Sequence, residues 1–584
     1  MQNAVKTVDV LPNLPSELDI VVLRPSDRDV ESDPRYQRQF RSDFRVRKGR
    51  VITWLRFLKD HHPDYRYITV SLDRINALPV DEDVSSSFAS VVDHDTGEGV
   101  QDQPILADLT PPNSQSMVPN LDITTTEIES IVQEITGRRL PPPSLPAPSI
   151  RLTPIDEASG KDRIFAMAFP TLYPTGRADF NTPRLRKVDL NDYARHLVRF
   201  HDRRFGQHPR WRFLIFNILM RRKANSSARF YVSKASGLKD MSRDELGDAL
   251  LADEGLLPQI VRQGSHLTGT RPFWRNKSNG LQAQARFLSP SMSPVFVTLS
   301  AADMQWQDLH RHFPGSADLA TADDRLRRTF IWDGVQRNPH IVAHYLAIRL
   351  RAFTEHVLRP LLGFTDSWDR FEWQARGSGH SHGLFWIPTA PPLDQETDES
   401  RDKFAQYWGS VITAWNPDQF RLPDARNPAS LAPADVANTT DQFAAFLNRL
   451  QMHSACRAPY CLRAKKGEDQ PTCRFFFPRP LCTAPVVTKA INHKAWLFSP
   501  ARNQETLNQC APAITMGWMA NTDIQPPTSL RAVLSYIGKY VSKPEKSSTS
   551  YTELQAQVLP YMNDRAPLLS FVSKILNKLI RERD

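Results

Sequence analysis

The stretch Glu372-Trp-Gln-Ala-Arg-Gly-Ser-Gly-His380-Ser-His382-Gly-Leu-Phe-Trp386 decides the predicted fold of this chain. Residues 370–375 and 380–387 have the composition of two β-strands, and the glycines between them predict a tight turn and an antiparallel hairpin. Because side chains alternate between the faces of a strand, the two histidines should share one face. A pair of imidazoles on one face can bind a single divalent metal ion. Two structural histidines in a sheet are the alternative.

The segments before this hairpin complete the predicted fold. A strand is expected at residues 295–300 and a long amphipathic helix at about residues 338–362. The order strand, helix, hairpin predicts an α+β fold, an antiparallel sheet backed by helices. Further helices are expected at residues 192–200 and 211–222, where arginines alternate with aromatic side chains. Such residues can clamp a single nucleic-acid strand, but a packed core with arginines reaching into solvent is the preferred interpretation.

A catalytic metal site of this kind usually takes a third polar ligand, which the preceding strand can supply. Glu372 and Gln374 have the same parity on that strand, so either can face the histidines. The register of the hairpin decides between them, and Gln374 is the first choice. We expect Mg²⁺ or Mn²⁺, because a hard divalent ion polarises a phosphate, and imidazole ligands suit Mn²⁺ better.

A second motif, Tyr536-Ile-Gly-Lys539-Tyr540-Val-Ser-Lys543, lies in a predicted helix over residues 529–543. Tyrosines four residues apart share one face of a helix. A phenol has an ordinary pKa of about 10, and the two lysines could favour its ionised form or neutralise a phosphate. Tyrosines at this spacing usually serve packing. Together with the histidine pair, they are the residues expected of an enzyme that cuts single-stranded DNA and stays covalently attached to one end.

Residues 450–480 contain a cluster of three cysteines and one histidine: His453, Cys456, Cys461 and Cys473. Three thiolates and one imidazole match a tetrahedral Zn²⁺ site. Because four ligands leave no open position, zinc would be structural here. Reduced cysteines without a metal are the alternative.

The charge of the chain is unevenly distributed. Residues 75–137 hold 12 acidic side chains and no Lys or Arg, whereas the whole chain has a net charge of +10. The other residues therefore carry +22, a balance that suits a polyanion such as nucleic acid. Five cysteines do not indicate a secreted disulfide scaffold. The N-terminus lacks a signal-peptide pattern, and no run of about 18 apolar residues predicts a membrane span, so an intracellular protein is expected.

Three regions are predicted along the chain. Residues 1–80 should form a small folded region with a helix from about Val51. Residues 81–150 are acidic and then proline-rich, which predicts a disordered linker. Residues 151–584 should form the main domain, with residues 450–480 as a zinc-loop insertion.

Four stretches make the chain resemble a known family. They are residues 169–176, 295–306, 372–382 and 518–543, and the cysteine cluster also fits. With them the chain resembles the N-terminal Rep, or helicase-like, domain of Helitron transposases, the rolling-circle transposable-element proteins of the HUH endonuclease superfamily. The resemblance covers about residues 160–584. Residues 20–80 resemble a segment found upstream of this domain in Helitron-type proteins.

The resemblance implies an activity and a set of roles. A tyrosine attacks a DNA phosphodiester, forms a 5′-phosphotyrosine link and leaves a free 3′-hydroxyl. Carried over to this sequence, Tyr536 and Tyr540 are the nucleophiles, while His380 and His382 bind the metal ion. Single-stranded transposon ends are the implied partner and the nucleus the implied location. Relatives continue into a helicase, but no G-x-x-x-x-G-K-[ST] motif occurs in this chain, so no ATPase is expected in it and a separate helicase is a further expected partner.

Two residues of the histidine motif depart from the family. Relatives usually have proline before the first histidine and an apolar residue between the two, where this chain has Gly379 and Ser381. The leading hypothesis is a metal-dependent nicking and strand-transfer domain of a truncated Helitron protein. A catalytically inactive DNA-binding remnant or domesticated fragment is the second hypothesis, and a zinc-stabilised protein-interaction module is the third.

Overall fold

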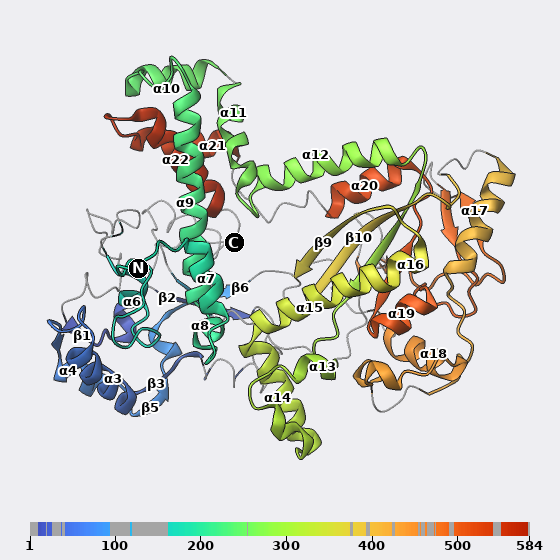
Figure 1. Cartoon of the computed structure of the whole chain (residues 1–584), viewed down its shortest axis with the longest axis horizontal. Helices are drawn as coiled ribbons and strands as arrows, with labels where there is room; N and C mark the ends of the chain where they lie inside the picture. The colour runs from blue at the N-terminus through green and yellow to red at the C-terminus, as the bar shows by residue number, and fades with distance from the viewer. Residues whose placement is uncertain are drawn as a thin grey trace. The chain divides into compact units, whose positions relative to one another are not determined.

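The computed structural model describes residues 10–18, 20–25, 43–93, 117–119, 162–253, 255–373, 378–392, 397–422, 427–453, 462–463, 472–473, 475–489, 496–540 and 550–581, with the single residues 37, 41, 160 and 456 (Figure 1). Contacts divide the described chain into two compact units. The division falls between Ile218 and Leu219, inside helix α9 (Trp211–Lys234). The boundaries predicted from the sequence, after residues 80 and 150, differ from this division. Those boundaries stay a prediction.

The first unit is built around α3 (Lys48–His61), the helix expected from about Val51. The buried side of α3 packs into a small apolar cluster of Leu55, Leu58, Tyr65 and Ile68. Tyr65 donates a 3.0 Å hydrogen bond to the carbonyl of Met167, which ties this region to residues 162–218. Further elements of the unit are β1 (Val10–Leu11), β2 (Ile20–Pro25), β3 (Arg45–Arg47), β4 (Thr69–Val70), α4 (Leu72–Ala77), β5 (Asp81–Asp83), β6 (Ala89–Asp93), β7 (Met117–Pro119), α6 (Ile164–Ala168), α7 (Leu190–Val198) and α8 (Arg204–Gln207).

The predicted disorder of residues 81–150 is wrong for the part of this stretch that the structure describes. Strand β5 pairs with β3, so Asp81–Asp83 lie opposite Arg45–Arg47, and the Arg45 guanidinium forms an ion pair with Asp81. Strands β6 and β7 both pair with β2. The acidic residues are compensated by a basic strand far upstream, which local composition does not reveal. Residues 94–116 and 120–150 lie outside the described residues.

The second unit contains a four-stranded sheet in the order β15-β8-β10-β9, in which every neighbouring pair is antiparallel. The predicted hairpin is confirmed, and its turn residues 374–377 lie outside the described residues. The predicted strand at residues 295–300 is confirmed as part of β8. The α+β class is confirmed as well. The strands are β8 (Ser293–Ser300), β9 (Asp366–Trp373), β10 (Gly379–Ile387) and β15 (Thr522–Gln525).

Helices cover both faces of this sheet. Figure 1 shows α12 (Arg271–Leu288) and α20 (Leu530–Tyr540) along one face, where they share an apolar cluster with the sheet: Leu281, Ala285, Leu288, Phe296, Leu384, Trp386, Val533 and Ile537. Helices α15 (Pro339–Phe353), α17 (Asp398–Val411) and α19 (Pro512–Trp518) contribute to the larger core on the opposite face. The helix predicted at residues 338–362 is confirmed as α15, a π-helical turn (Thr354–Leu358) and α16 (Arg359–Leu362).

A separate helical core follows from the second half of α9. It joins segments that are far apart in sequence, α10 (Arg243–Ala252), α11 (Leu256–Arg262), α21 (Tyr551–Val558) and α22 (Pro567–Arg581). Smaller helices of this unit are α13 (Gln307–His310), α14 (Asp324–Arg337) and α18 (Thr440–Phe446). Among the residues that the structure describes, no helix is both long enough and apolar enough to span a bilayer.

Candidate active site

The two histidines of the hairpin lie on the sheet face that α12 and α20 also cover. In the hydrogen-bonded register, His380 is opposite Ser300 of β8 and His382 is opposite Thr298. On the other side of β10, His380 is opposite Glu372 of β9. Directly opposed residues point to the same face, so the predicted shared face of the histidines is confirmed by the alternation along β10. Both side chains are buried, with 4% and 6% of their surface exposed.

Two hydroxyl groups of β8 hold the imidazole rings. The Ser300 hydroxyl lies 2.9 Å from His380 Nδ1, and the Thr298 hydroxyl lies 3.1 Å from His382 Nδ1. Because each contact occupies the Nδ1 atom, the Nε2 atoms are the ones left to bind a ligand. His380 Nε2 is buried without a hydrogen-bond partner among the described residues. A buried nitrogen without a partner costs free energy, which a bound metal ion would offset.

Glu372 is the third polar group at this point of the sheet. Its Oε2 atom lies 3.1 Å from His382 Nε2, so the second-choice ligand reaches the histidine pair. The first choice, Gln374, lies outside the described residues. Among the described residues, the three potential ligand atoms that lie close enough together to hold a metal ion are those of the cysteine cluster described below. Their assignment as metal ligands stays a prediction.

Burial decides the protonation of the first histidine. Removal from water and then the charge of His382 lower the pKa of His380 to about 4, while Glu372 acts in the opposite direction. The imidazole of His380 is therefore neutral near pH 7. Neutral imidazole is the form that binds a metal ion.

The tyrosine helix packs on the same sheet face as the histidines. Val533 and Ile537 of α20 contact the cluster that contains Phe296 of β8 and Leu384 of β10. These two sheet residues have the same strand parity as Thr298 and His382, so they point to the same face. Thus α20, the helix whose sequence includes Tyr536 and Tyr540, packs on the sheet face that carries the two histidines. Figure 1 shows α20 beside this sheet. The side chains of Tyr536, Lys539 and Tyr540 are not among those described, and Lys543 lies outside the described residues.

Sequence reasoning missed three polar residues of this face: Thr298, Ser300 and Asp523. Asp523 of β15 is opposite Thr298, and Asn508 donates a 3.4 Å hydrogen bond to its carboxylate. A row of polar side chains thus crosses all four strands through Asp523, Thr298, His382 and Arg370. Thr298 and Ser300 are two residues apart in the strand predicted at 295–300. This spacing could have indicated that both hydroxyls lie on one face. The four-residue strand β15 offers no comparable pattern.

The predicted zinc cluster comes together in part. His453 Nε2 lies 3.1 Å from Cys456 Sγ and 3.6 Å from Cys473 Sγ, and the three ligand atoms lie within 4.8 Å of one another. The three residues therefore form a group that could hold a metal ion, and its identity as zinc stays a prediction. Cys461 lies outside the described residues, but its neighbour Leu462 pairs with Cys473. Burial, and then the charge of Arg479, lower the pKa of His453, which favours the neutral form that metal binding needs.

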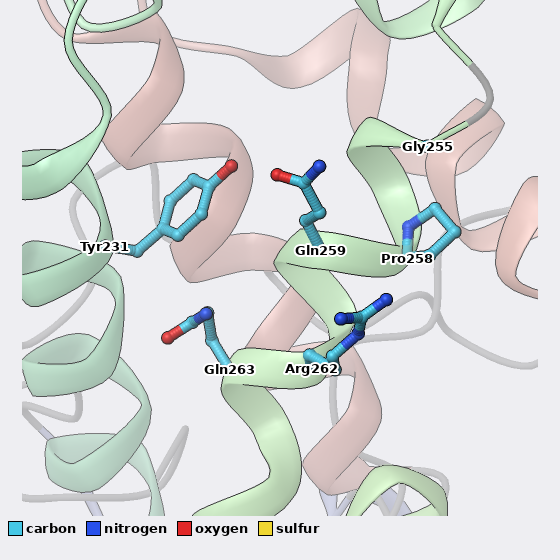
Figure 2. Close-up of a pocket in the computed structure, with 6 residues that line it drawn as sticks. All are labelled: Tyr231, Gly255, Pro258, Gln259, Arg262 and Gln263. Carbon is cyan, nitrogen blue, oxygen red and sulfur yellow. The ribbon is translucent and has the colours of Figure 1, made fainter.

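A cavity of about 480 Å³ lies away from the sheet, between α9 and α11. Figure 2 shows the Tyr231 ring, the amides of Gln259 and Gln263 and the Arg262 guanidinium around it. Its remaining lining residues are Gly255 and Pro258. None of the predicted site residues lines this cavity, so it is separate from the chemistry expected on the sheet.

Comparisons with known proteins identify two regions. The family model described as "Helitron helicase-like domain at N-terminus" matches residues 193–385, which run from α7 to β10 and include the histidine pair. The tyrosine helix and the cysteine cluster lie beyond the matched residues. A domain of unknown function, DUF6570, matches residues 1–76. A search of curated proteins found no match.

Proposed function

Because residues 193–385 match the model of a Helitron helicase-like domain, we propose that this chain nicks single-stranded DNA and transfers the cut strand during rolling-circle transposition. The finer assignment is an HUH-type endonuclease with a tyrosine nucleophile. One observation carries it. A buried histidine pair, with both Nδ1 atoms held by hydroxyls and one Nε2 without a partner among the described residues, lies on the sheet face that also binds the tyrosine helix.

In this proposal the metal ion is Mg²⁺ or Mn²⁺. His380 and His382 would hold it through Nε2, with Glu372 or Gln374 as the third ligand. When bound, such an ion supplies positive charge that polarises the scissile phosphate. The hydroxyls of Ser300 and Thr298 keep the two rings in the tautomer and orientation that this role needs.

The nucleophile in this proposal is the phenolic oxygen of Tyr536 or Tyr540. As it bonds to phosphorus, the phenol loses its proton and the bond from phosphorus to the 3′ oxygen breaks. The 3′ oxygen gains a proton and leaves as a free hydroxyl, while the downstream fragment stays on the enzyme as a 5′-phosphotyrosine. We assign Lys539 and Lys543 to stabilising the phenolate and the phosphate charge. The second tyrosine would serve the second cleavage or the return step.

Two further assignments accompany this proposal. A structural Zn²⁺ would be held by His453, Cys456, Cys461 and Cys473, and the geometry of the three described ligands supports it. The partners would be single-stranded transposon ends and a separate helicase, with the nucleus as the place of action. The net charge of +10 supports a nucleic-acid partner.

Covalent trapping tests the proposal directly. Single-stranded oligonucleotides labelled at the 3′ end are incubated with the protein and Mn²⁺, because a 5′-phosphotyrosine retains the downstream fragment. A labelled band that survives denaturing electrophoresis is expected for the wild type and is lost in the double variant Tyr536→Phe/Tyr540→Phe. The matched control is Tyr561→Phe, since Tyr561 is an exposed tyrosine on another segment.

The single variants Tyr536→Phe and Tyr540→Phe identify which phenol attacks. His380→Ala should abolish the adduct and also the binding of Mn²⁺ measured by calorimetry. Absence of any adduct from the wild type with Mg²⁺ and with Mn²⁺ would refute the enzyme and favour a non-catalytic DNA-binding protein. An adduct that persists in the double tyrosine variant would refute the assignment of the nucleophiles.

A further inference from the structure

Two interactions fix the direction of α12 along the sheet. Near its C-terminal end, the Gln284 amide donates a 2.9 Å hydrogen bond to Asp366, at the start of β9. Near its N-terminal end, the Trp274 ring stacks on the Arg370 guanidinium, 3.7 Å from the ring centroid. Arg370 is directly opposite His382 on β10. The helix therefore runs along β9 (Figure 1). The contact of Trp274 with Arg370, opposite His382, makes its N-terminal end the end closer to the histidine pair.

One flank of α12, beside its buried side, carries a stripe of basic and amide side chains. The helix contains four Lys or Arg residues and no Asp or Glu. At about 100° per residue, five polar positions fall within an arc of about 80° and extend over about 22 Å. We call them the α12 stripe: Arg271, Arg275, Asn279, Gln282 and Arg286. The buried side of the helix is apolar and packs on the sheet, so the stripe is not needed for that packing.

Two cations of the stripe are not balanced by acidic side chains of the described residues. Arg275 and Arg286 are exposed and form no ion pair with any described residue. Helix α14 differs, because its arginines are mixed with Asp324 and Asp333. A helix surface whose charged side chains are all cationic, and which ends beside the histidine pair, matches an anionic ligand.

Aromatic side chains accompany the cations. Phe287 is 83% exposed and follows Arg286 in the sequence, about 100° further round the helix. Trp274 lies near the N-terminal end of the helix, on the Arg370 guanidinium. Unpaired bases stack on aromatic rings while Lys and Arg contact the phosphates. This combination is more typical of a single strand than of a duplex, whose bases are already stacked.

We propose that the α12 stripe binds the phosphates of a single DNA strand and leads it to the histidine pair. Trp274 on Arg370 forms the platform at which the strand enters the site. This inference rests on the proposed function for its substrate, but it concerns binding alone and needs neither the metal ion nor the tyrosines. A strand that follows the stripe passes along this flank of α12 and reaches the sheet at β9.

The salt dependence of binding measures how many phosphates the protein neutralises. A fluorescent oligo-dT of about 20 nucleotides is titrated with the protein in EDTA, and affinity is followed by anisotropy at several salt concentrations. For a single strand, removing one cation that neutralises a phosphate flattens the slope of log K against log salt by about 0.7. Arg275→Gln/Arg286→Gln should therefore flatten it by about 1.4 and weaken binding about 25-fold at 0.1 M salt.

Two matched variants control this comparison. Arg275→Lys/Arg286→Lys keeps the charges and should keep the slope and most of the affinity. Arg325→Gln/Arg328→Gln removes the same charge from exposed positions of α14 and should leave the slope unchanged. A duplex of the same length should lose much less affinity than the single strand in the Arg275→Gln/Arg286→Gln variant.

The outcomes separate this inference from the proposed function. An unchanged slope in Arg275→Gln/Arg286→Gln overturns the α12 stripe, even if the wild type forms the covalent adduct. An equal loss in the α14 variant overturns it too, because net charge alone would then explain the effect. Equal losses for duplex and single strand overturn the choice of a single strand. If the wild type forms no adduct but the stripe variant flattens the slope as expected, the stripe stands and only the nicking activity falls.

Discussion

Asp303 should make the stability of this protein fall as the pH rises. It follows β8 and is 5% exposed, and neither oxygen of its carboxyl group has a hydrogen-bond partner among the described residues. Burial raises the pKa of Asp303 from 3.8 to about 7, and the nearby Ser378 hydroxyl offsets this only in part. Between these two pKa values the unfolded chain releases the proton that the folded chain retains. The unfolded state then binds fewer protons, so the free energy of unfolding decreases with rising pH.

The size of this effect follows from the two pKa values. Each pH unit between the two pKa values lowers the free energy of unfolding by up to about 1.4 kcal/mol. The decrease from pH 5 to pH 7 is about 2 kcal/mol. Asp303→Asn has nearly the same shape and carries no titrating proton. The free energy of unfolding of this variant, relative to that of the wild type, should therefore rise by about 2 kcal/mol between pH 5 and pH 7.

Guanidinium unfolding followed by tryptophan fluorescence at several pH values checks this prediction. All other titrating groups are common to the two proteins and cancel in the difference between their free energies of unfolding. A difference that stays constant from pH 5 to pH 7 would refute the conclusion that the carboxyl group is buried and protonated.

Three further perturbations test separate parts of the site. Gly379→Ala should destabilise the fold by about 1–3 kcal/mol in guanidinium unfolding, because a Cβ there would lie 2.4 Å from Leu346 Cδ2; unchanged stability would contradict this close packing. Thr298→Val should weaken Mn²⁺ binding about 10–100-fold in calorimetry by releasing His382 Nδ1, whereas Thr298→Ser should restore it; equal affinities for both variants would argue against the positioning role. Cys473→Ser should lower the zinc content of the purified protein, measured by a colorimetric chelator, and an unchanged content would exclude this thiolate as a ligand.

The hairpin was predictable because its signals are local. Strand composition flanks glycines in residues 370–387, and the alternation of side chains places His380 and His382 on one face whatever the pairing. The choice between Glu372 and Gln374 was not predictable, since both have the same parity and only the register separates them. The register depends on the turn, whose sequence allows more than one geometry.

Long-range pairing explains most of what the sequence did not reveal. Asp523 joins the site only because β15 pairs with β8, more than 200 residues earlier, and a strand of four residues carries too little pattern to indicate its partner. The acidic strand β5 was mistaken for disorder for the same reason, because its basic partner β3 lies upstream. Helix α12 was not predicted because its polar side chains outnumber the apolar ones that face the sheet.

The departure at Gly379 has a local cause in the packing beneath the hairpin. Relatives of the resembled family usually place proline there, but in this chain the Leu346 and Trp373 side chains occupy the space that a larger residue would need. Gly379 is therefore matched to its neighbours in this chain and is not by itself a sign of decay. The histidine pair that follows keeps its hydroxyl partners and its burial.

One face of the sheet combines two opposite requirements. Its half around Phe296, Leu384 and Trp386 is apolar and gains free energy by binding α12 and α20. Its other half buries two imidazoles and leaves the Nε2 atom of His380 without a partner among the described residues, which opposes folding. Both halves lie on the same strands. The apolar half holds the tyrosine helix in place, and its favourable packing offsets the free-energy cost of the buried polar half. A substitution that improved the polar half for stability, such as filling it with apolar side chains, would remove the groups that distinguish this face from an ordinary core.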